Sequence, residues 1–328
     1  MAHAGTSFLG CDVPILCGAM SWVSERNLVA AVSNAGGFGV LAASVMTPEA
    51  LTAEIDATRA LTTRPFGVNL VTLHPRLNDQ IETCVERAVD LVVLGGSLPP
   101  SGSVKRLKSA GIRVVCFAPT LALAHRLVRS GADALIIEGA EAGGHIGPTA
   151  TSVLAQEILP SLSSVPVFIA GGIGRGEAIA AYLQLGAAAC QLGTRFVCAT
   201  ESIAHPNFKA ALIKATARDA VVSPRLSEMF SVIPVRALAN KAMDDYRETQ
   251  LELMERCRRG EIDRQGAQDA IENFWAGRLR RAVILGDVEN GSLMAGQSVA
   301  LVHAEQSVAE IIEELVDQAV NMLMAREA

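Results

Sequence analysis

The sequence predicts an α/β fold, a (β/α)8 or TIM barrel with a helical insertion after its eighth strand. Three observations lead to this prediction. Short apolar β-type runs recur between residues 13 and 193, and a helix-length amphipathic segment follows each of them. The runs begin roughly 22 to 32 residues apart, a usual length for one βα unit. Glycine-rich turns follow several runs, at the strand ends where such barrels place their active sites.

Eight strands are predicted in order. They are Val13–Cys17, Phe38–Ala42, Phe66–Val71, Asp90–Leu94, Ile112–Phe117, Ala134–Glu138, Pro166–Ala170 and Ala189–Gly193. Eight successive βα units without a detectable sequence repeat favour a closed barrel over a doubly wound sheet. The intervening helices have start and stop signals. Thr47 and Pro48 supply a capping hydroxyl and a proline at the first helical position, while Gly131 and Gly186 each end a helix.

The pattern changes after Ala215, and this change divides the chain. Residues 1–215 are predicted to form the barrel. Residues 216–300 are helical in character with charge clusters and no visible strand period, so they are predicted to form a helical insertion or lid. Residues 301–328 contain a last helix that packs back on the barrel, with apolar positions at helical spacing at Ile311, Ile312, Leu315, Val316 and Ala319.

The composition argues against several classes of protein. Half of the 328 residues are hydrophobic and 19% are charged, which suits strands that are covered on both faces. The net charge of −6 argues against a nucleic-acid partner. No signal-peptide pattern or membrane-spanning run is visible, so we expect a cytoplasmic protein with no membrane partner. The seven cysteines have no CxxC or metal-finger spacing, so we expect reduced, packed thiols and no metal.

Three glycine-marked strand ends predict a site. The sixth strand is followed by residues 138–147, in which Gly143 and Gly144 precede His145. Glycine permits positive φ and close approach, and histidine is the side chain best suited to proton transfer near neutral pH. The seventh strand ends in Ala170-Gly171-Gly172 and the eighth in Gly193-Thr194. Converging backbone N–H groups at such turns indicate a phosphate-bearing cofactor beside the histidine.

With these residues in place, the chain resembles the flavin-dependent nitronate monooxygenase and enoyl-ACP reductase II superfamily over nearly its whole length. Two later segments, 201–209 and 279–298, resemble the enoyl-ACP reductase II branch in particular. Residues 94–100 depart from that branch, which usually has a Gly-Ala-Gly-Asn-Pro type turn there. The shared motifs lie at residues 14–23, 31–39, 64–69, 138–147 and 193–196.

The resemblance implies FMN as the cofactor, and the predicted binding residues follow from it. The phosphate candidates are Gly171, Gly172, Gly193 and Thr194. Glu138 either accepts hydrogen bonds in the cofactor pocket or pairs with Arg195, which we expect to be an ion-pair anchor. The candidates beside the ring and elsewhere in the cofactor pocket are Gly18, Ala19, Met20, Asn69, Gly143, Gly144, Ala170 and Gln191.

His145 is the predicted catalytic residue, and three activities remain open for it. The first is NAD(P)H-dependent reduction of an enoyl thioester, with NADH or NADPH as co-substrate and His145 assisting protonation. The second is oxidation of alkyl nitronates with O2, and the third is quinone reduction by NAD(P)H. The substrate is accordingly a small molecule or an acyl-carrier-bound group, and the resemblance allows for a homodimer. The residues after Gly291 and around His205 favour the first activity.

Overall fold

Eight parallel strands close into a barrel in the computed structural model, which describes residues 2–96, 98–228, 230 and 232–325. The strands are neighbours in chain order and the last pairs back with the first. All eight predicted strands are confirmed, with the largest difference in bounds at the first. The strands are β1 (Ile15–Cys17), β2 (Phe38–Ala42), β3 (Gly67–Val71), β4 (Leu91–Gly95), β5 (Arg113–Phe117), β6 (Ala134–Glu138), β8 (Val167–Ala170) and β9 (Ala189–Leu192).

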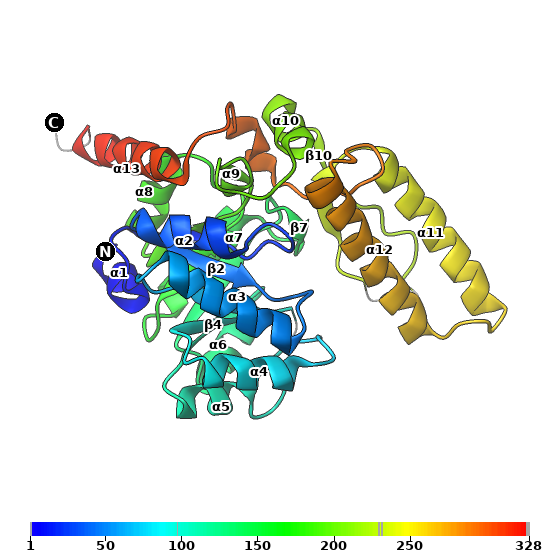
Figure 1. The fold of residues 1–328 in the computed structure, drawn as a ribbon, viewed down its shortest axis with the longest axis horizontal. Coiled ribbons are helices and arrows are strands. Elements are labelled where there is room, and N and C mark those ends of the chain that lie inside the picture. The colour runs from blue at the N-terminus through cyan, green and yellow to red at the C-terminus, as the bar shows by residue number, and fades with distance from the viewer. Residues whose placement is uncertain (1, 97, 229, 231, 326–328) are drawn as a thin grey trace.

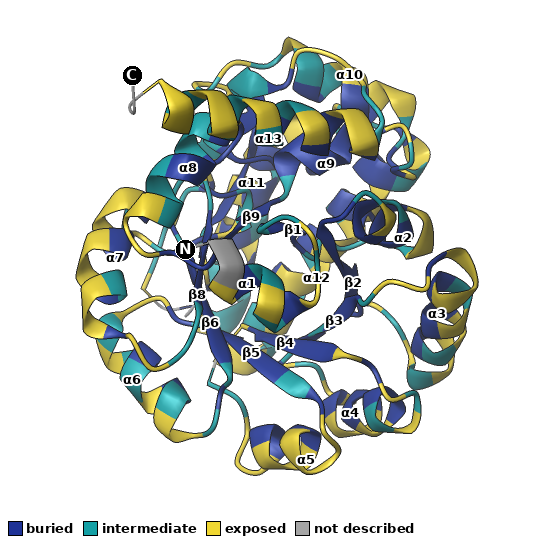
Figure 2. Cartoon of the chain, turned by 90° about the vertical axis from the view of Figure 1, so that its left-hand side faces the viewer, coloured by how far each residue is buried: buried dark blue, intermediate teal, exposed yellow. Residues whose placement is uncertain are grey.

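Helices cover the outside of the barrel (Figure 2). The predicted signals around α3 are confirmed, because Thr47 Oγ1 accepts from Ala50 N and Pro48 is the first helical residue. The outer helices and helical turns are α2 (Arg26–Asn34), α3 (Pro48–Leu61), α4 (Leu77–Glu86), α5 (Ser103–Ser109), α6 (Leu121–Arg129), α7 (Thr151–Ile158), η1 (Leu159–Ser161), α8 (Gly176–Gln184), α9 (Thr194–Val197) and α10 (Pro206–Lys214).

Alternate strand residues fill the barrel interior, as period-two geometry requires. Leu16, Val93, Ile136 and Phe168 belong to one inner apolar cluster. The residues between them pack outward against the helices in a second, larger cluster. Helix α1 (Ala2–Leu9), which the sequence did not predict, closes the amino-terminal end of the barrel (Figure 2). Its Phe8 ring lies 5.8 Å from that of Phe168.

The insertion lies at the opposite end of the barrel from α1 (Figure 1). Its helical part consists of α11 (Lys241–Arg258) and α12 (Arg264–Leu285). The two helices pack through Tyr246 and Trp275, whose ring centroids lie 4.5 Å apart. It also contains two strands, β10 (Ala220–Val222) and β11 (Val235–Leu238), where no strand pattern was visible in the sequence. These strands form a three-stranded antiparallel sheet with β7 (Gly144–His145), which lies in the loop after β6.

The last helix, α13 (Val308–Met324), packs on the barrel against α8. The contact is so close that a Cβ on Gly176 would lie 1.9 Å from the Leu315 carbonyl oxygen. The 3-10 helix η2 (Gln297–Leu301) connects the insertion to this helix. Within the described ranges, no helix combines the length and the apolar run that crossing a bilayer demands.

Candidate active site

The strand register brings three of the predicted residues into one row at the carboxyl end of the barrel. Glu138 of β6 lies opposite Ala170 of β8, and Ala170 lies opposite Gln191 of β9. Glu138 is two residues after Ile136, an inner residue, and therefore faces the interior as well. Asn69 of β3 has the same orientation, because its neighbours Val68 and Leu70 pack outward. Polar side chains thus line the mouth of an otherwise apolar barrel.

The loop after β1 joins this row. Gly18 N donates to the Leu192 carbonyl at 2.9 Å, which fixes the loop against β9. A Cβ on Gly18 would lie 3.0 Å from the Gln191 amide, and one on Gly193 would lie 3.4 Å from Met20 Sδ. Gly18, Met20, Gln191 and Gly193 are therefore neighbours, and Ala19 packs at the edge of the inner cluster. The predicted ring-binding residues converge on one surface.

Glu138 is the unusual group in this surface. The residue as a whole is half-buried, but its carboxyl group lies inside the barrel wall. Removal of the carboxyl group from water raises the pKa of Glu138 to about 8. In the described part of the chain, the carboxyl group has no hydrogen bond or ion pair. The alternative pairing with Arg195 is wrong, because the Arg195 guanidinium pairs with Glu314 of α13. Arg195 is an ion-pair anchor for that helix, as predicted.

His145 lies on β7, opposite Val235 of β11. The side chain is 39% exposed, and its Nε2 lies 3.2 Å from Oε2 of Glu272 on α12. The next pair in the register brings Arg236 beside Gly144. The Arg236 guanidinium is buried and donates to the carbonyls of Ala140 and Ala220, and burial lowers its pKa. The insertion therefore supplies a carboxylate beside the histidine, from Glu272, and a buried guanidinium beside the preceding residue in the register, from Arg236.

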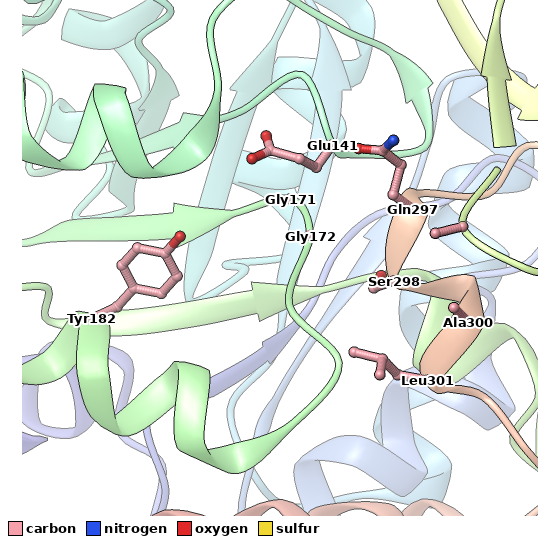
Figure 3. Close-up of a pocket in the computed structure, with 9 residues that line it drawn as sticks. Glu141, Gly171, Gly172, Tyr182, Gln297, Ser298, Ala300 and Leu301 are labelled. Carbon is pink, nitrogen blue, oxygen red and sulfur yellow. The ribbon is translucent and has the colours of Figure 1, made fainter.

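The Gly171–Gly172 turn borders a pocket of about 300 Å³. Both glycines have positive φ, +94° and +73°, so the turn needs residues without a Cβ. Figure 3 shows Glu141 turned away from Gln297 and Ser298, and its carboxylate accepts from Thr151 N and Oγ1 at 2.8 and 2.9 Å. The pocket is lined by Glu141, Gly171, Gly172, Tyr182, Ala217, Gln297, Ser298, Ala300 and Leu301.

Two of the other predicted cofactor residues have protein partners. Thr194 Oγ1 accepts from Gly296 N at 2.9 Å, so its hydroxyl holds the segment before η2. Gly143 approaches the same segment, since a Cβ there would lie 2.6 Å from the Ala295 carbonyl carbon. Gly144 has a φ of +79°, and only Met294 Sδ, at 3.7 Å, lies within 4 Å of the position its Cβ would occupy. Packing within the chain thus explains Gly143, while Gly144 turns the chain into β7.

Sequence reasoning missed Arg236, Glu272, Gln297 and Ser298. Arg236 reaches the site through the pairing of β11 with β7, and Glu272 reaches it through the packing of α12. No local sequence pattern predicts either of these contacts. Gln297 and Ser298 lie in segment 279–298, which resembles the enoyl-ACP reductase II branch. Their position directly after Gly296 in that segment could have identified them as candidate site residues. These two residues line the pocket beside the glycine turn.

The residues present fit FMN. A flavin ring offers an edge of donors and acceptors and a flat apolar face. The amides of Asn69 and Gln191 and the unpartnered Glu138 carboxyl match such an edge, and Met20 and Ala19 provide apolar contact. The small Gly18 and Gly193 leave room for a planar group. The pocket at Gly171 and Gly172 has the size and backbone geometry for a phosphate end.

Comparison with known proteins identifies the class. The nitronate monooxygenase family model matches residues 3–90 and 76–318. The structure of FabK, an enoyl-ACP reductase II, from Thermotoga maritima is 36% identical with a TM-score of 0.88, covering 98% of this chain and 97% of that one. A nitronate monooxygenase of Paraburkholderia phytofirmans is 33% identical over 67% of this chain and 74% of its own.

A third relative acts on a coenzyme A derivative, according to its name. It is the (3aS,4S,5R,7aS)-5-hydroxy-7a-methyl-1-oxo-octahydro-1H-indene-4-carboxyl-CoA dehydrogenase of Mycobacterium tuberculosis, 29% identical over 98% of this chain and 97% of its own. The fold, the site and these similarities define an FMN-dependent oxidoreductase. The chain belongs to the nitronate monooxygenase family.

Proposed function

We propose that this oxidoreductase reduces an enoyl thioester with NADH or NADPH, with His145 as the catalytic residue. The observation that supports this most is the similarity to FabK, which extends over nearly the whole of both chains and so includes the insertion that pairs with β7. The name of the relative from Mycobacterium tuberculosis also describes a carboxyl-CoA substrate. A thioester is therefore the substrate class common to both relatives.

Bound FMN would supply the redox chemistry, hydride transfer between the nicotinamide and the β-carbon of the enoyl thioester. Asn69 and Gln191 would bind the polar edge of the ring, and Glu138, neutral near pH 7, would donate a hydrogen bond to it. Gly171, Gly172 and Ser298 would bind the phosphate. These residues orient the cofactor before the substrate enters.

His145 acts on the substrate in this proposal. When the β-carbon gains hydride, the α-carbon must gain a proton and the thioester oxygen bears developing negative charge. The imidazole of His145 would donate the proton or a hydrogen bond at that point.

Nitronate oxidation is the second candidate, and the family model and the relative from Paraburkholderia phytofirmans favour it. In that reaction His145 would assist proton removal from a nitroalkane or hold the nitronate anion. Anaerobic stopped-flow measurement separates the two reactions. Rapid bleaching of the flavin by NADH or NADPH, and reoxidation by crotonyl-CoA, would support the reductase. Turnover of propionate 3-nitronate with O2, without bleaching by either nicotinamide, would overturn it.

Replacement of the histidine tests the catalytic role directly. We expect His145→Ala to retain FMN, because its side chain is not among those assigned to the cofactor. Loss of its proton transfer is expected to lower kcat by about 100-fold or more. Flavin content is measured by absorbance and kcat by steady-state kinetics in the active assay. Turnover near that of the wild type would remove His145 from the mechanism.

A further inference from the structure

We propose that Glu272 of the insertion is a positioning residue that orients the His145 imidazole through the contact between its carboxylate and Nε2. The inference rests on the proposed catalytic role of His145. The two residues are far apart in the sequence, and the carboxylate reaches the histidine because α12 lies at the barrel mouth, with Oε2 3.2 Å from Nε2. The inference extends the active site to an element outside the barrel.

The fold, and not the ion pair, determines where Glu272 lies. Both partners are partly exposed, 39% and 53%, so the pair itself contributes little to stability. The flanking residues Ile271 and Trp275 are buried in the core of the insertion. Asp263 caps the start of α12, and Arg278 pairs with Asp245 of α11 at 2.8 Å. The helix therefore holds the carboxylate in place before any ligand binds.

A second contact fixes α12 relative to the barrel. The Arg280 guanidinium lies over the Trp22 ring, 5.5 Å from its centroid, and Trp22 belongs to the loop after β1. Arg280 is eight residues after Glu272, about 12 Å along the helix axis. Arg280 thus holds the helix on the β1 side of the mouth, and this places Glu272 beside β7.

This arrangement has a chemical consequence at the imidazole. A carboxylate beside Nε2 favours a proton on that nitrogen and leaves Nδ1 as the ring nitrogen for the substrate. The backbone of His145 is already fixed by pairing with Val235, so the remaining freedom is the rotation of its side chain. The contact with Glu272 restricts that rotation. Loss of this contact is then expected to reduce the fraction of bound substrate that meets a correctly oriented ring.

Three variants on one helix test the proposal. Glu272→Ala removes the acceptor, and Glu272→Gln retains an acceptor oxygen without the charge. Asp269→Ala removes a carboxylate one turn earlier, which bonds to Gln265. We expect Glu272→Ala to lower kcat about 10-fold with KM changed less than about twofold. Glu272→Gln should recover most of the loss, and Asp269→Ala should behave like the wild type.

A spectroscopic measurement keeps the test independent of turnover. In FMN-loaded protein labelled with 15N-histidine, the His145 signal is identified by its absence in His145→Asn. We expect its Nε2–H proton to be observed in the wild type and in Asp269→Ala, and to be lost by fast exchange in Glu272→Ala. Identical spectra and kcat in the two alanine variants would overturn the role of Glu272. An inactive enzyme with the expected spectra would instead contradict only the proposed function.

Discussion

Glu138 is the residue whose chemistry the barrel changes most. A carboxyl group in the inner row beside Ala170 loses water without gaining a partner in the described part of the chain, and its pKa rises to about 8. At pH 7 it is therefore a hydrogen-bond donor. Sequence reasoning placed the residue at the end of the sixth strand but left its partner open, since pairing with Arg195 depends on where α13 docks.

The raised pKa makes the stability of the FMN-free protein depend on pH. Below the ordinary value of 4.5 both states bind the proton, so the native state has its full stability there. As the pH rises from there to about 8, the unfolded chain has released its proton while the native state still binds it, so stability falls, and the loss is complete above about 8. We expect Glu138→Gln to melt at least about 2 °C above the wild type at pH 9 and within 1 °C, roughly, at pH 5.

The matched control for this comparison is Glu86→Gln. Glu86 is exposed at the end of α4, so its replacement should leave the pH dependence of the melting temperature unchanged. Scanning calorimetry from pH 5 to 9 makes the measurement. Parallel curves for Glu138→Gln and the wild type across this range would show that the carboxyl group is not buried in the way described.

The glycine turn after β8 connects the barrel to the pocket that we propose for the phosphate of FMN. Gly171 has a φ of +94°, and a Cβ there would lie 3.1 Å from the Gly139 carbonyl oxygen and from Thr151 Oγ1. An added methyl group therefore strains the backbone and displaces the pocket wall. The turn at these glycines could be predicted from the sequence because strand ends and turn residues are local signals, whereas their role in binding phosphate stays a prediction.

Alanine substitution separates strain from ligand binding. Gly102 has nearly the same φ, +93°, but nothing lies within 4 Å of the position of its Cβ, and it caps α5 away from the pocket. We expect Gly171→Ala to weaken FMN binding about 10-fold or more, while Gly102→Ala costs similar backbone strain and leaves Kd unchanged. Fluorescence titration of the apoprotein with FMN measures Kd. Equal Kd values for the two variants would remove the turn from the cofactor site.

The insertion shows where element prediction from sequence fails. Its two helices have long local patterns and were anticipated. Its strands are three and four residues long, and their third partner, β7, contains only Gly144 and His145. Strands this short show no period, and their register depends on contacts across about 90 residues. Arg236 and Glu272 were missed for the same reason.

At the scale of the whole molecule, α13 ties the end of the chain to the barrel. Gly176 lies against the backbone of Leu315, and Gly176 N donates to Gln318 Oε1 at 2.8 Å. We expect Gly176→Leu to displace α13 and to lower the melting temperature by about 4 °C or more. The control is Gly277→Leu on α12, where a Cβ would meet nothing within 4 Å. Its melting temperature should be lowered less than that of Gly176→Leu. Equal losses would contradict close docking at Gly176.

The closed amino-terminal end of the barrel affects the order in which reactants can bind. With α1 packed against Phe168 on one side, the described part of the chain leaves the carboxyl end of the barrel as the route to the inner row. If the proposed reaction holds, a nicotinamide and an acyl thioester would share that entrance. Their binding would then alternate, and the oxidised nicotinamide would have to leave before the thioester could approach the ring.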